Sequence, residues 1–306
     1  PDNVKLIYWD YYSVQKENYL KRIENHRKIK NDIWFAGGLW SWTGFAPHNS
    51  YSVRATNAGL SACREKNVEN IFLTLWGDNG SEGSKFSLLP SLFYASELVK
   101  GNTDINGIKQ KFENKYGIPF DGFMLLDLPG TANDRDPEVD IKNADKNMLY
   151  NDCFMGTLDL TVRDDDGERF GAVAEKLKAY TDNTDFGYLF EAMSALCELL
   201  SLKCTVGRLT RKAYSDRDTA ELKRLLSVYG EILSSLDKFY RAYRRQWFKD
   251  NKPQGFEVQD IRLGGLYFRI RHCKERLEAF LSGEIKNIDE LNEEILPTVL
   301  GGTEYN

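Results

Sequence analysis

Three short apolar runs, each followed by a helical pattern, open this chain of 306 residues. The runs cover residues 4–9, 32–38 and 68–76, and each is rich in β-branched and aromatic side chains. Strands that alternate with helices run parallel to one another, and parallel sheets belong to α/β folds whose sheet faces are covered. The first hundred residues therefore predict a βα segment. Three strands alone are too few to close a barrel.

Three helices are expected within this segment, one after each strand. They span about residues 13–29, 50–67 and 84–99, where apolar residues recur at helical spacing among charged ones. Ser50 or Ser52 is the expected N-cap of the second helix, because a serine side chain accepts a hydrogen bond from the free N–H groups of a helix start.

Long helical patterns dominate the chain from residue 165 onward. Apolar residues recur at i, i+3, i+4 and i+7, and residues 218–250 predict a helix about 45 Å long. Four residues then interrupt the pattern and predict a loop before a last helix at about 266–281. They are Pro253, Gly255, Gly264 and Gly265. The expected parts are a βα segment (1–100), a turn-rich connector with one short helix (101–164) and a helical bundle domain (165–306).

Tryptophan lies at the end of all three predicted strands. The first run ends in YWDYY, the second continues into GGLWSWTGF and the third into LWGDNGSEG. Because ligands of βα folds bind at the carboxyl ends of the strands, the aromatic residues there are expected at one site. They are Trp9, Tyr11, Tyr12, Trp40, Trp42 and Trp76. A single tryptophan more often packs against a neighbouring loop, but four at equivalent positions favour a binding site.

Aromatic walls beside carboxylates suit a pyranose ring. The C–H faces of a sugar lie flat on an indole, and we expect Asp10 and Asp78 to accept hydrogen bonds from its hydroxyl groups. Two other interpretations stay open at this point. Asp78 also fits a turn residue that bonds its own backbone, and Asp10 fits the N-terminal end of a helix.

Other chemistries lack the residues that they need. The net charge is −5 and the basic residues are dispersed, so nucleic acid is not an expected partner. There is no GxGxxG motif, no P-loop and no metal-ligand cluster, so neither a cofactor nor a metal is expected. A nucleophilic triad is poorly supported, because His26 and His272 lie in charged helical patterns and His48 has no evident serine or cysteine partner.

The cysteines and the hydropathy indicate the cellular compartment in which the protein is expected. Five cysteines are widely spread and form no CxxC pair, which predicts reduced thiols rather than a disulfide framework or a zinc site. No run reaches the roughly 18 to 20 apolar residues of a membrane span, and the N-terminus shows no signal-peptide pattern. We expect a cytoplasmic protein without a membrane partner.

Several stretches together resemble the C-terminal half of a glycoside hydrolase family 20 β-N-acetylhexosaminidase. The resemblance is to the bacterial exo-acting branch with a helical C-terminal domain, and it covers nearly the whole chain. The stretches are WDYY (9–12), FAGGLWSWTGFAPHN (35–49), CREKNVENIFLTLWGDNGSEGSKFSLLPSLFYASELV (63–99) and NKPQGFEVQDIRLGG (251–265).

The resemblance implies a (β/α)8 TIM barrel of which this chain holds strands six to eight, followed by an α-helical bundle domain. In the family, a Trp-Gly-acid motif supplies a ring that forms the floor of the subsite for the terminal hexosamine and an acid that binds its outer hydroxyl groups. These roles fall on Trp76 and Asp78, and Trp9 falls on the family's aromatic wall. At strand seven the family commonly has a tyrosine. Here the candidates are Trp40 and Trp42, and which of them faces the sugar stays open.

The implied activity is the removal of terminal β-linked N-acetylglucosamine or N-acetylgalactosamine. A glutamic acid protonates the leaving oxygen, the substrate's own acetamide carbonyl attacks the anomeric carbon, and an aspartate orients the acetamide. This Asp-Glu pair belongs upstream of Pro1, and we reject the Asp289–Glu290 pair because it lies in a charged helical pattern near the C-terminus. We expect no catalytic residue in this chain, which by itself should be inactive.

The expected partners are a terminal N-acetylhexosamine, the missing N-terminal half of the barrel, and a second copy of the chain through the helical domain. A function of a different class is also open: a non-catalytic carbohydrate-binding or dimerisation module. Residues 255–265 (GFEVQDIRLGG) support it as an interface loop between two helices, although a simple connection fits them as well. A Rossmann-like domain would need a glycine-rich first turn, which is absent.

Overall fold

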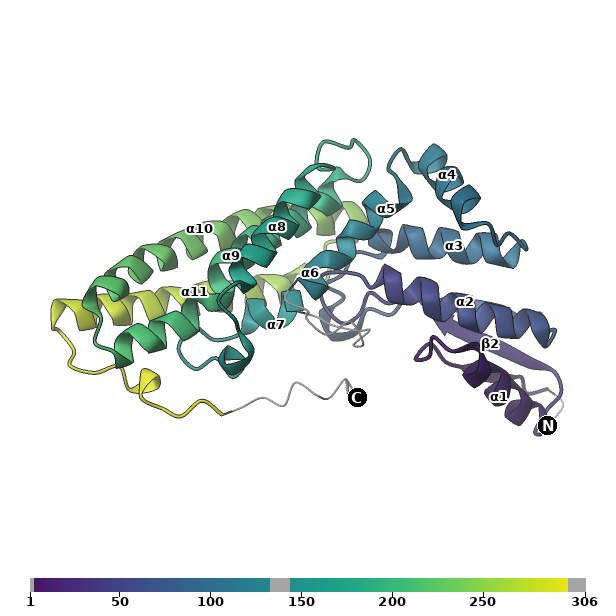
Figure 1. Cartoon of the computed structure of the whole chain (residues 1–306), viewed down its shortest axis with the longest axis horizontal. Coiled ribbons are helices and arrows are strands. Elements are labelled where there is room, and N and C mark those ends of the chain that lie inside the picture. The colour runs from purple at the N-terminus through teal and green to yellow at the C-terminus, as the bar shows by residue number, and fades with distance from the viewer. Residues whose placement is uncertain (1–2, 133–143, 297–306) are drawn as a thin grey trace. The chain divides into compact units, whose positions relative to one another are not determined.

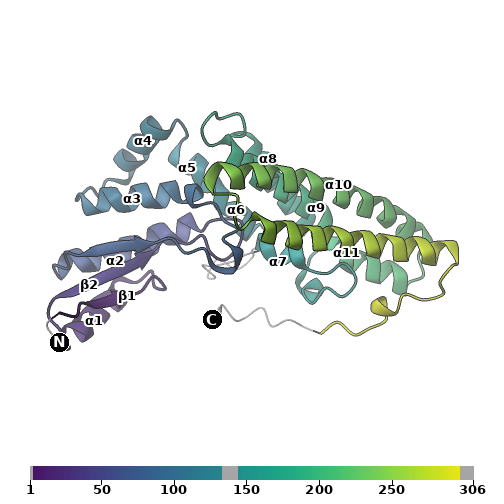
Figure 2. The ribbon, with the colours of Figure 1, turned by 180° about the vertical axis from the view of Figure 1, so that it is seen from behind.

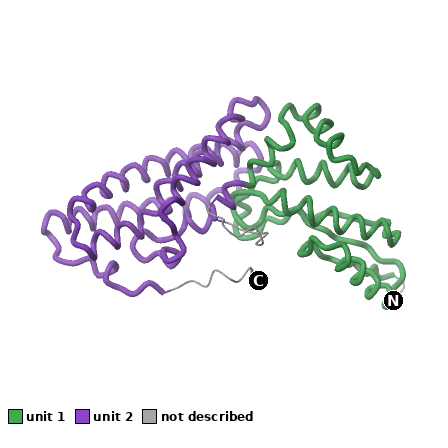
Figure 3. The backbone as a smooth tube through the Cα atoms, viewed as in Figure 1, with its two compact units in different colours: residues 1–127 green, residues 128–306 purple. Residues whose placement is uncertain are grey.

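The computed structural model describes residues 3–132 and 144–296, and the chain divides into two compact units, Pro1–Asp127 and Leu128–Asn306 (Figure 3). The first unit holds the sheet and the helices that cover it, and the second is helical. The boundary falls inside the region predicted as a connector, and the three-part division into domains stays a prediction.

A three-stranded parallel sheet forms the centre of the first unit. Its strands are β1 (Leu6–Trp9), β2 (Ile33–Gly38) and β3 (Ile71–Thr74), in the order β1-β2-β3. All three predicted strands and their parallel direction are confirmed. The sheet is small and most of the chain is helical, so the structure shows an α/β part and an all-α part without showing a closed barrel.

Three helices pack on one side of this sheet: α1 (Lys16–Arg27) and α2 (Asn49–Glu65) contact the strands, and α3 (Leu89–Val99) packs against α2 and adds to the same core (Figures 1 and 2). Alternate strand residues point toward them, because side chains of a strand alternate between its two faces. The resulting core includes Tyr8, Ile33, Phe35, Tyr19, Ile23 and Cys63. The third helix was expected from residue 84, but a 3-10 turn over Lys85–Leu88 precedes it.

The opposite face of the sheet is apolar and uncovered among the described residues. Ile7, Trp9 and Phe72 project from it, and Phe72 keeps 41% of its surface exposed. Parallel sheets are normally covered on both faces, since their strands are apolar on both sides. Within the described residues of the first unit, this face therefore presents exposed apolar side chains.

The start of α2 corrects the expected N-cap. The N-cap residue is His48 rather than Ser50 or Ser52, and its side chain makes no capping hydrogen bond. The carboxylate of Asp127, far away in the sequence, accepts the hydrogen bonds of the helix start instead. Asp127 accepts hydrogen bonds from the backbone N–H of Asn49 (2.9 Å) and Ser50 (2.7 Å), and from both their side chains. Burial raises the pKa of Asp127 to about 6, although these four bonds act in the opposite direction. No local sequence pattern connects two groups that are 77 residues apart.

The end of the first unit contains the short helix predicted near residue 105. Helix α4 (Ile105–Tyr116) is capped by the Asp104 side chain and ends at Gly117, whose φ of 68° is left-handed. The shorter α5 (Phe120–Phe123) and a 3-10 turn over Met124–Asp127 follow it.

The second unit is a bundle of long helices. Helix α9 packs against both α8 and α10, and α11 packs against α10 (Figure 1). The helices are α6 (Leu128–Thr131), α7 (Ala144–Tyr150), α8 (Asp166–Lys178), α9 (Gly187–Ser215), α10 (Thr219–Asp250) and α11 (Phe256–Ser282). Large buried aromatic residues such as Phe190, Tyr229 and Phe239 fill the bundle. The expectation of a helix of more than thirty residues is confirmed by the 32 residues of α10.

The loop that was predicted before the last helix is shorter than expected, because α11 includes most of its residues. The helix begins at Phe256 and continues without a break through Gly264 and Gly265. The chain breaks the helical pattern at Gly255 instead, where φ is 99°. Glycines inside a helix each cost only about 1 kcal/mol relative to alanine, and the buried residues Leu263 and Ile270 on either side compensate for that cost.

Three smaller features complete the comparison with the sequence. The Asp289–Glu290 pair lies in a 3-10 turn (Asp289–Leu291), not in a helix, and Arg276 binds Glu290 at 2.9 Å. All five cysteines are buried with free thiols. Among the described residues, no helix is both long enough and apolar enough for a membrane span.

Candidate functional site

The carboxyl ends of the strands bring aromatic rings together, and the role of these rings in binding stays a prediction. The rings of Trp9 and Trp76 lie 5.6 Å apart between centroids, and those of Trp9 and Tyr11 lie 6.1 Å apart. Trp9 is 56% exposed and Trp76 is 39% exposed, so both keep ring surface open to solvent. Side chains along an extended chain alternate between the two faces of a sheet. Tyr11 follows Trp9 by two residues, so both side chains lie on the same face.

Small residues of the central strand make room for these rings. Ala36 is the register partner of Trp9 on β2, and Gly38 pairs with Thr74 on β3. A Cβ atom on Gly38 would lie 2.6 Å from the Tyr11 ring, which is closer than any real contact. Gly38 is therefore required for Tyr11 to pack across the end of β2.

The loop after β2 adds two tryptophans with different surroundings. Trp40 and Trp42 stack with their centroids 4.3 Å apart. Trp40 is buried, and its indole Nε1 donates a hydrogen bond to the backbone oxygen of Tyr11 at 3.3 Å. Trp42 is only partly buried and lies 5.2 Å from the Tyr11 ring. Of the two, Trp42 has the more accessible ring.

The two tyrosines also differ. Tyr11 is buried among the rings, and this burial raises the pKa of its hydroxyl, so the group stays protonated at neutral pH. Tyr12 is largely exposed and packs on Tyr11 at 4.8 Å and on Trp40 at 5.5 Å. Tyr12 therefore lies at the outer rim of the cluster.

Asp78 begins a short 3-10 turn (Asp78–Gly80) directly after Trp76 and Gly77. Its side chain is exposed to solvent. The turn is conformationally demanding, because Asn79 and Ser81 both have left-handed φ values near 50°. Both interpretations of Asp78, a sugar-binding carboxylate and a turn residue, stay predictions.

Lys85 is a site residue that the sequence did not suggest. Its ammonium group donates to Ser41 Oγ at 2.9 Å and to the backbone oxygen of Trp76. The Ser41 hydroxyl also donates to that backbone oxygen, at 3.3 Å. Burial lowers the pKa of Lys85 to about 8, and the charge of Asp78 acts in the opposite direction. Lys85 thus joins the end of β3 to the loop after β2, and nothing in the spacing of GSEGSK indicates this contact.

Asp10 has a different environment from the one expected of a sugar-binding carboxylate. It is buried on the helix-covered side, where Tyr8 Oη donates to it at 2.7 Å and the backbone N–H of Tyr12 at 2.9 Å. Arg22 Nε lies 3.6 Å away. Asp10 therefore fixes the backbone between Trp9 and Tyr12, and its contact with a sugar stays a prediction.

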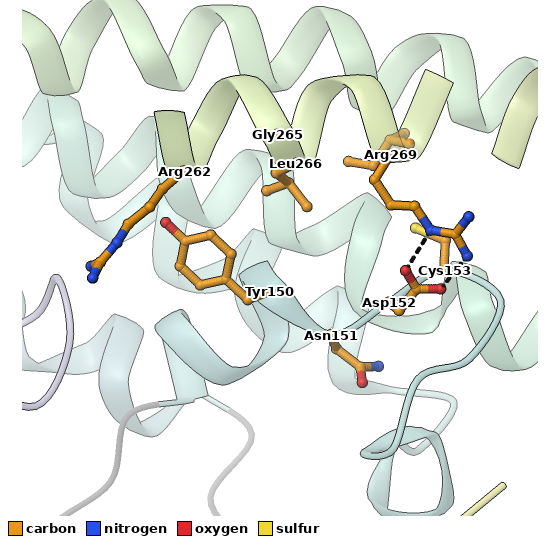
Figure 4. Close-up of a pocket in the computed structure, with 9 residues that line it drawn as sticks. Tyr150, Asn151, Asp152, Cys153, Arg262, Gly265, Leu266 and Arg269 are labelled. Atoms are coloured by element: carbon orange, nitrogen blue, oxygen red, sulfur yellow. Dashed lines mark hydrogen bonds and ion pairs between the residues drawn. The ribbon is translucent and has the colours of Figure 1, made fainter. Parts of the chain in front are cut away.

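The second unit has a separate hollow of about 210 Å³ between the end of α7 and α11 (Figure 4). Its charged groups are already engaged with each other. Arg269 binds both carboxylate oxygens of Asp152, with its Nε at 2.7 Å and an Nη at 3.0 Å. Burial raises the pKa of Asp152, but the bonds from Arg269 and from two backbone N–H groups outweigh this effect and hold it at about 2. We assign no ligand to this hollow. Across residues 3–132 and 144–296, no group of three histidine, cysteine or acidic residues is placed to hold a metal ion.

Comparison with known proteins identifies the family. The family model for the Glycoside Hydrolase 20C C-terminal domain matches residues 121–304. A search of the curated proteins found no match. The matched segment covers nearly all of the helical unit and lies after the aromatic cluster in the sequence. Because it makes up more than half of the 306 residues, the chain belongs to glycoside hydrolase family 20 and carries the C-terminal domain of its 20C group.

Proposed function

We propose that the chain is the C-terminal half of an exo-β-N-acetylhexosaminidase, in which the first unit supplies strands six to eight of a TIM barrel. The observation that carries the proposal is the pair of open rings, Trp9 and Trp76, beside the exposed carboxylate of Asp78 at the carboxyl ends of parallel strands. The family membership of the second unit supports it independently. The substrate class is a terminal β-linked N-acetylglucosamine or N-acetylgalactosamine.

Each aromatic residue has a distinct role in the proposal. Trp76 forms the floor under the sugar ring, Trp9 forms the adjoining wall, and Trp42, with its accessible ring, takes the place of the family's strand-seven tyrosine. Trp40 and Tyr11 support these rings from below. Asp78 accepts hydrogen bonds from the outer hydroxyl groups, and such bonds to a carboxylate are about twice as strong as neutral ones.

Catalysis then depends on residues outside this chain. The reaction is substrate-assisted: the acetamide oxygen of the substrate attacks the anomeric carbon, while a glutamic acid protonates the leaving oxygen. The glutamic acid and the aspartate that orients the acetamide belong to strand four of the same barrel. The uncovered apolar face of the sheet is consistent with a barrel interior that further strands complete.

The test is hydrolysis of an aryl N-acetyl-β-glucosaminide by the longer enzyme with Asp78→Ala. We expect kcat/KM to fall by a factor that corresponds to about 1 to 3 kcal/mol of lost transition-state stabilisation. This is the usual effect of losing a charged hydrogen bond to substrate. The matched control is Asp121→Ala, which removes an exposed carboxylate of the same unit that pairs with Lys109. Equal activity of the Asp78 variant and the wild type would reduce Asp78 to a turn residue.

The isolated 306-residue chain provides the second arm. We expect no hydrolysis, because general acid catalysis is worth about 10² to 10⁴ in rate and the acetamide orienter is absent as well. Measured turnover by the purified chain would contradict the proposal. Binding of N-acetylglucosamine by a chain that never joins a barrel would favour the alternative function, a carbohydrate-binding module.

A further inference from the structure

Asp127 is a buried carboxylate to which the proposed function gives no role. Its oxygen Oδ1 accepts hydrogen bonds from the backbone N–H and the side chain of Asn49, at 2.9 and 3.0 Å. Its oxygen Oδ2 accepts from the backbone N–H and the hydroxyl of Ser50, at 2.7 and 2.8 Å. Burying a carboxylate is costly unless its oxygens are paired, and here both oxygens are paired with the first two residues of α2.

The start of α2 closes the β2 loop (residues 39–48), which carries two of the tryptophans. The backbone N–H of His48 donates to the backbone oxygen of Trp40, and the backbone N–H of Trp40 donates to the Ser52 hydroxyl, both at 2.9 Å. The Ser52 hydroxyl in turn donates to the backbone oxygen of His48 at 2.7 Å. Trp42 stacks on Trp40, so the first turn of α2 holds the backbone on which both rings depend.

The side chain of Asn49 connects Asp127 to the β3 loop (residues 75–88) as well. Its amide nitrogen donates to the backbone oxygen of Ser87 at 2.9 Å in addition to Asp127. Ser87 belongs to the 3-10 turn that begins at Lys85, and Lys85 donates to the backbone oxygen of Trp76. Hydrogen bonds from one carboxylate therefore lead to both loops that carry the proposed sugar-binding rings.

We propose that Asp127 is a positioning residue of the sugar site, which fixes the start of α2 and thereby the places of Trp42 and Trp76. The inference rests on the proposed function, since it assigns a role within the same site. A carboxylate suits this task because the start of a helix has free N–H groups and a positive dipole end. Asp127 lies inside the segment 121–304 that matches the family's C-terminal domain. That segment thus contributes to the sugar site without contacting the sugar.

Hydrogen exchange of the full 306-residue chain tests the positioning without a substrate. Asp127→Asn keeps the size of the side chain, but it replaces one acceptor oxygen by an amide group that faces the donors of Asn49 or Ser50. We expect the backbone amides of the β2 loop and the β3 loop to exchange about tenfold faster, because their common anchor is lost. The amides of α9, in the second unit, should exchange as in the wild type.

Glu97→Gln is the matched control, and Ser50→Ala is a milder second variant. Glu97 is a similarly buried carboxylate of the first unit, but it pairs with Lys100 and Lys111, so its replacement should leave exchange in both loops unchanged. Ser50→Ala removes only the hydroxyl that donates to Asp127. It should raise exchange in the β2 loop by about threefold, and it keeps the test valid if Asp127→Asn does not fold.

Kinetics of the longer enzyme on an aryl N-acetyl-β-glucosaminide separate positioning from instability. Displaced rings bind the substrate and the transition state equally poorly, so Asp127→Asn should raise KM about tenfold and leave kcat within about twofold. A variant that only unfolds part of the enzyme lowers kcat at an unchanged KM, because the remaining folded molecules bind normally.

Three results would overturn the proposal. One is wild-type exchange of both loops in Asp127→Asn and Ser50→Ala, and another is an equal rise of exchange in Glu97→Gln. The third is a wild-type KM of Asp127→Asn in an assay where Asp78→Ala loses activity. If exchange rises as expected while neither Asp127→Asn nor Asp78→Ala changes the kinetics, Asp127 positions the two loops and the proposed function is wrong. The two proposals therefore fail separately.

Discussion

At the scale of single residues, strand geometry decides which members of the predicted site share a surface. Trp9 and Asp10 are neighbours in sequence, but side chains of a strand alternate between faces, so Trp9 projects to the uncovered face and Asp10 to the helix-covered one. The residue types at the strand ends were sufficient to predict the aromatic cluster. They were not sufficient to find Lys85, whose contacts depend on how a glycine-rich turn returns to Ser41.

Lys85→Met should weaken the connection between the end of β3 and the loop after β2. The substitution keeps the length of the side chain and removes the donor to Ser41 and to the Trp76 backbone oxygen. We expect the free energy of unfolding of the first unit to fall by about 1 to 3 kcal/mol, because the buried hydroxyl of Ser41 loses the charged ammonium group that donates to it. Urea denaturation followed by tryptophan fluorescence measures this change.

The control for Lys85 is Lys109→Met, which breaks an exposed pair with Asp121. Exposed ion pairs contribute roughly 0 to 1 kcal/mol, so this variant should remain close to the wild type. If both variants lost the same stability, Lys85 would be an ordinary surface lysine. Its contacts between the two loops would then not stabilise the fold.

At the scale of elements, the helices were predicted more reliably than their ends. The apolar spacing of residues 218–250 predicted α10 almost to its boundaries, because thirty residues of regular pattern average out local exceptions. The start of α11 was misplaced because Gly264 and Gly265 usually signal a break, and buried contacts of the helix outweigh their weak propensity. The start of α2 depends on Asp127, a contact that no local pattern encodes.

The pair of Asp152 and Arg269 connects the segment after α7 to α11, and its strength should depend on pH. The folded-state pKa of Asp152, about 2, lies below its ordinary value of 3.8, so the ionised form stabilises the fold. This contribution is fully present above about pH 5 and is lost as the pH falls from about 4 toward 2. Its size is on the order of 2 kcal/mol.

Arg269→Met should therefore lower the stability of the second unit at pH 7 and make less difference at pH 3. Denaturation midpoints at pH 7, 5, 4 and 3 measure the gap between variant and wild type. Arg241→Met, which removes the partner of Asp237 in an exposed pair on α10, serves as the control and should give a small gap at every pH. If the difference in midpoint between Arg269→Met and the wild type stayed the same at every pH, the packing of the Arg269 side chain would stabilise the fold and its charge would not.

At the scale of the whole molecule, the sequence predicted two kinds of fold in one chain, and the structure confirms a parallel βα unit followed by helices. What the sequence pattern alone did not reveal is that helices cover only one face of the sheet in the described residues. Strands that are apolar on both sides are typical of a sheet with two covered faces, but the pattern does not indicate which segments cover each face. The assignment to a barrel comes from the resemblance to the family and stays a proposal.

Phe72 offers a direct test of that barrel. It lies on β3 and is 41% exposed on the uncovered face, so Phe72→Ala should change the stability of the isolated chain by only about 0.5 kcal/mol. In a longer enzyme whose further strands close a barrel over this face, the same side chain becomes part of the interior. There the substitution should cost about 3 to 5 kcal/mol, the usual range for removing a buried phenylalanine. The control, Phe86→Ala, is at a similarly exposed position on the turn before α3 and should be mild in both proteins. A small effect of Phe72→Ala in the longer enzyme would mean that its other strands do not cover this sheet, and Trp9 and Trp76 would then not face a barrel interior.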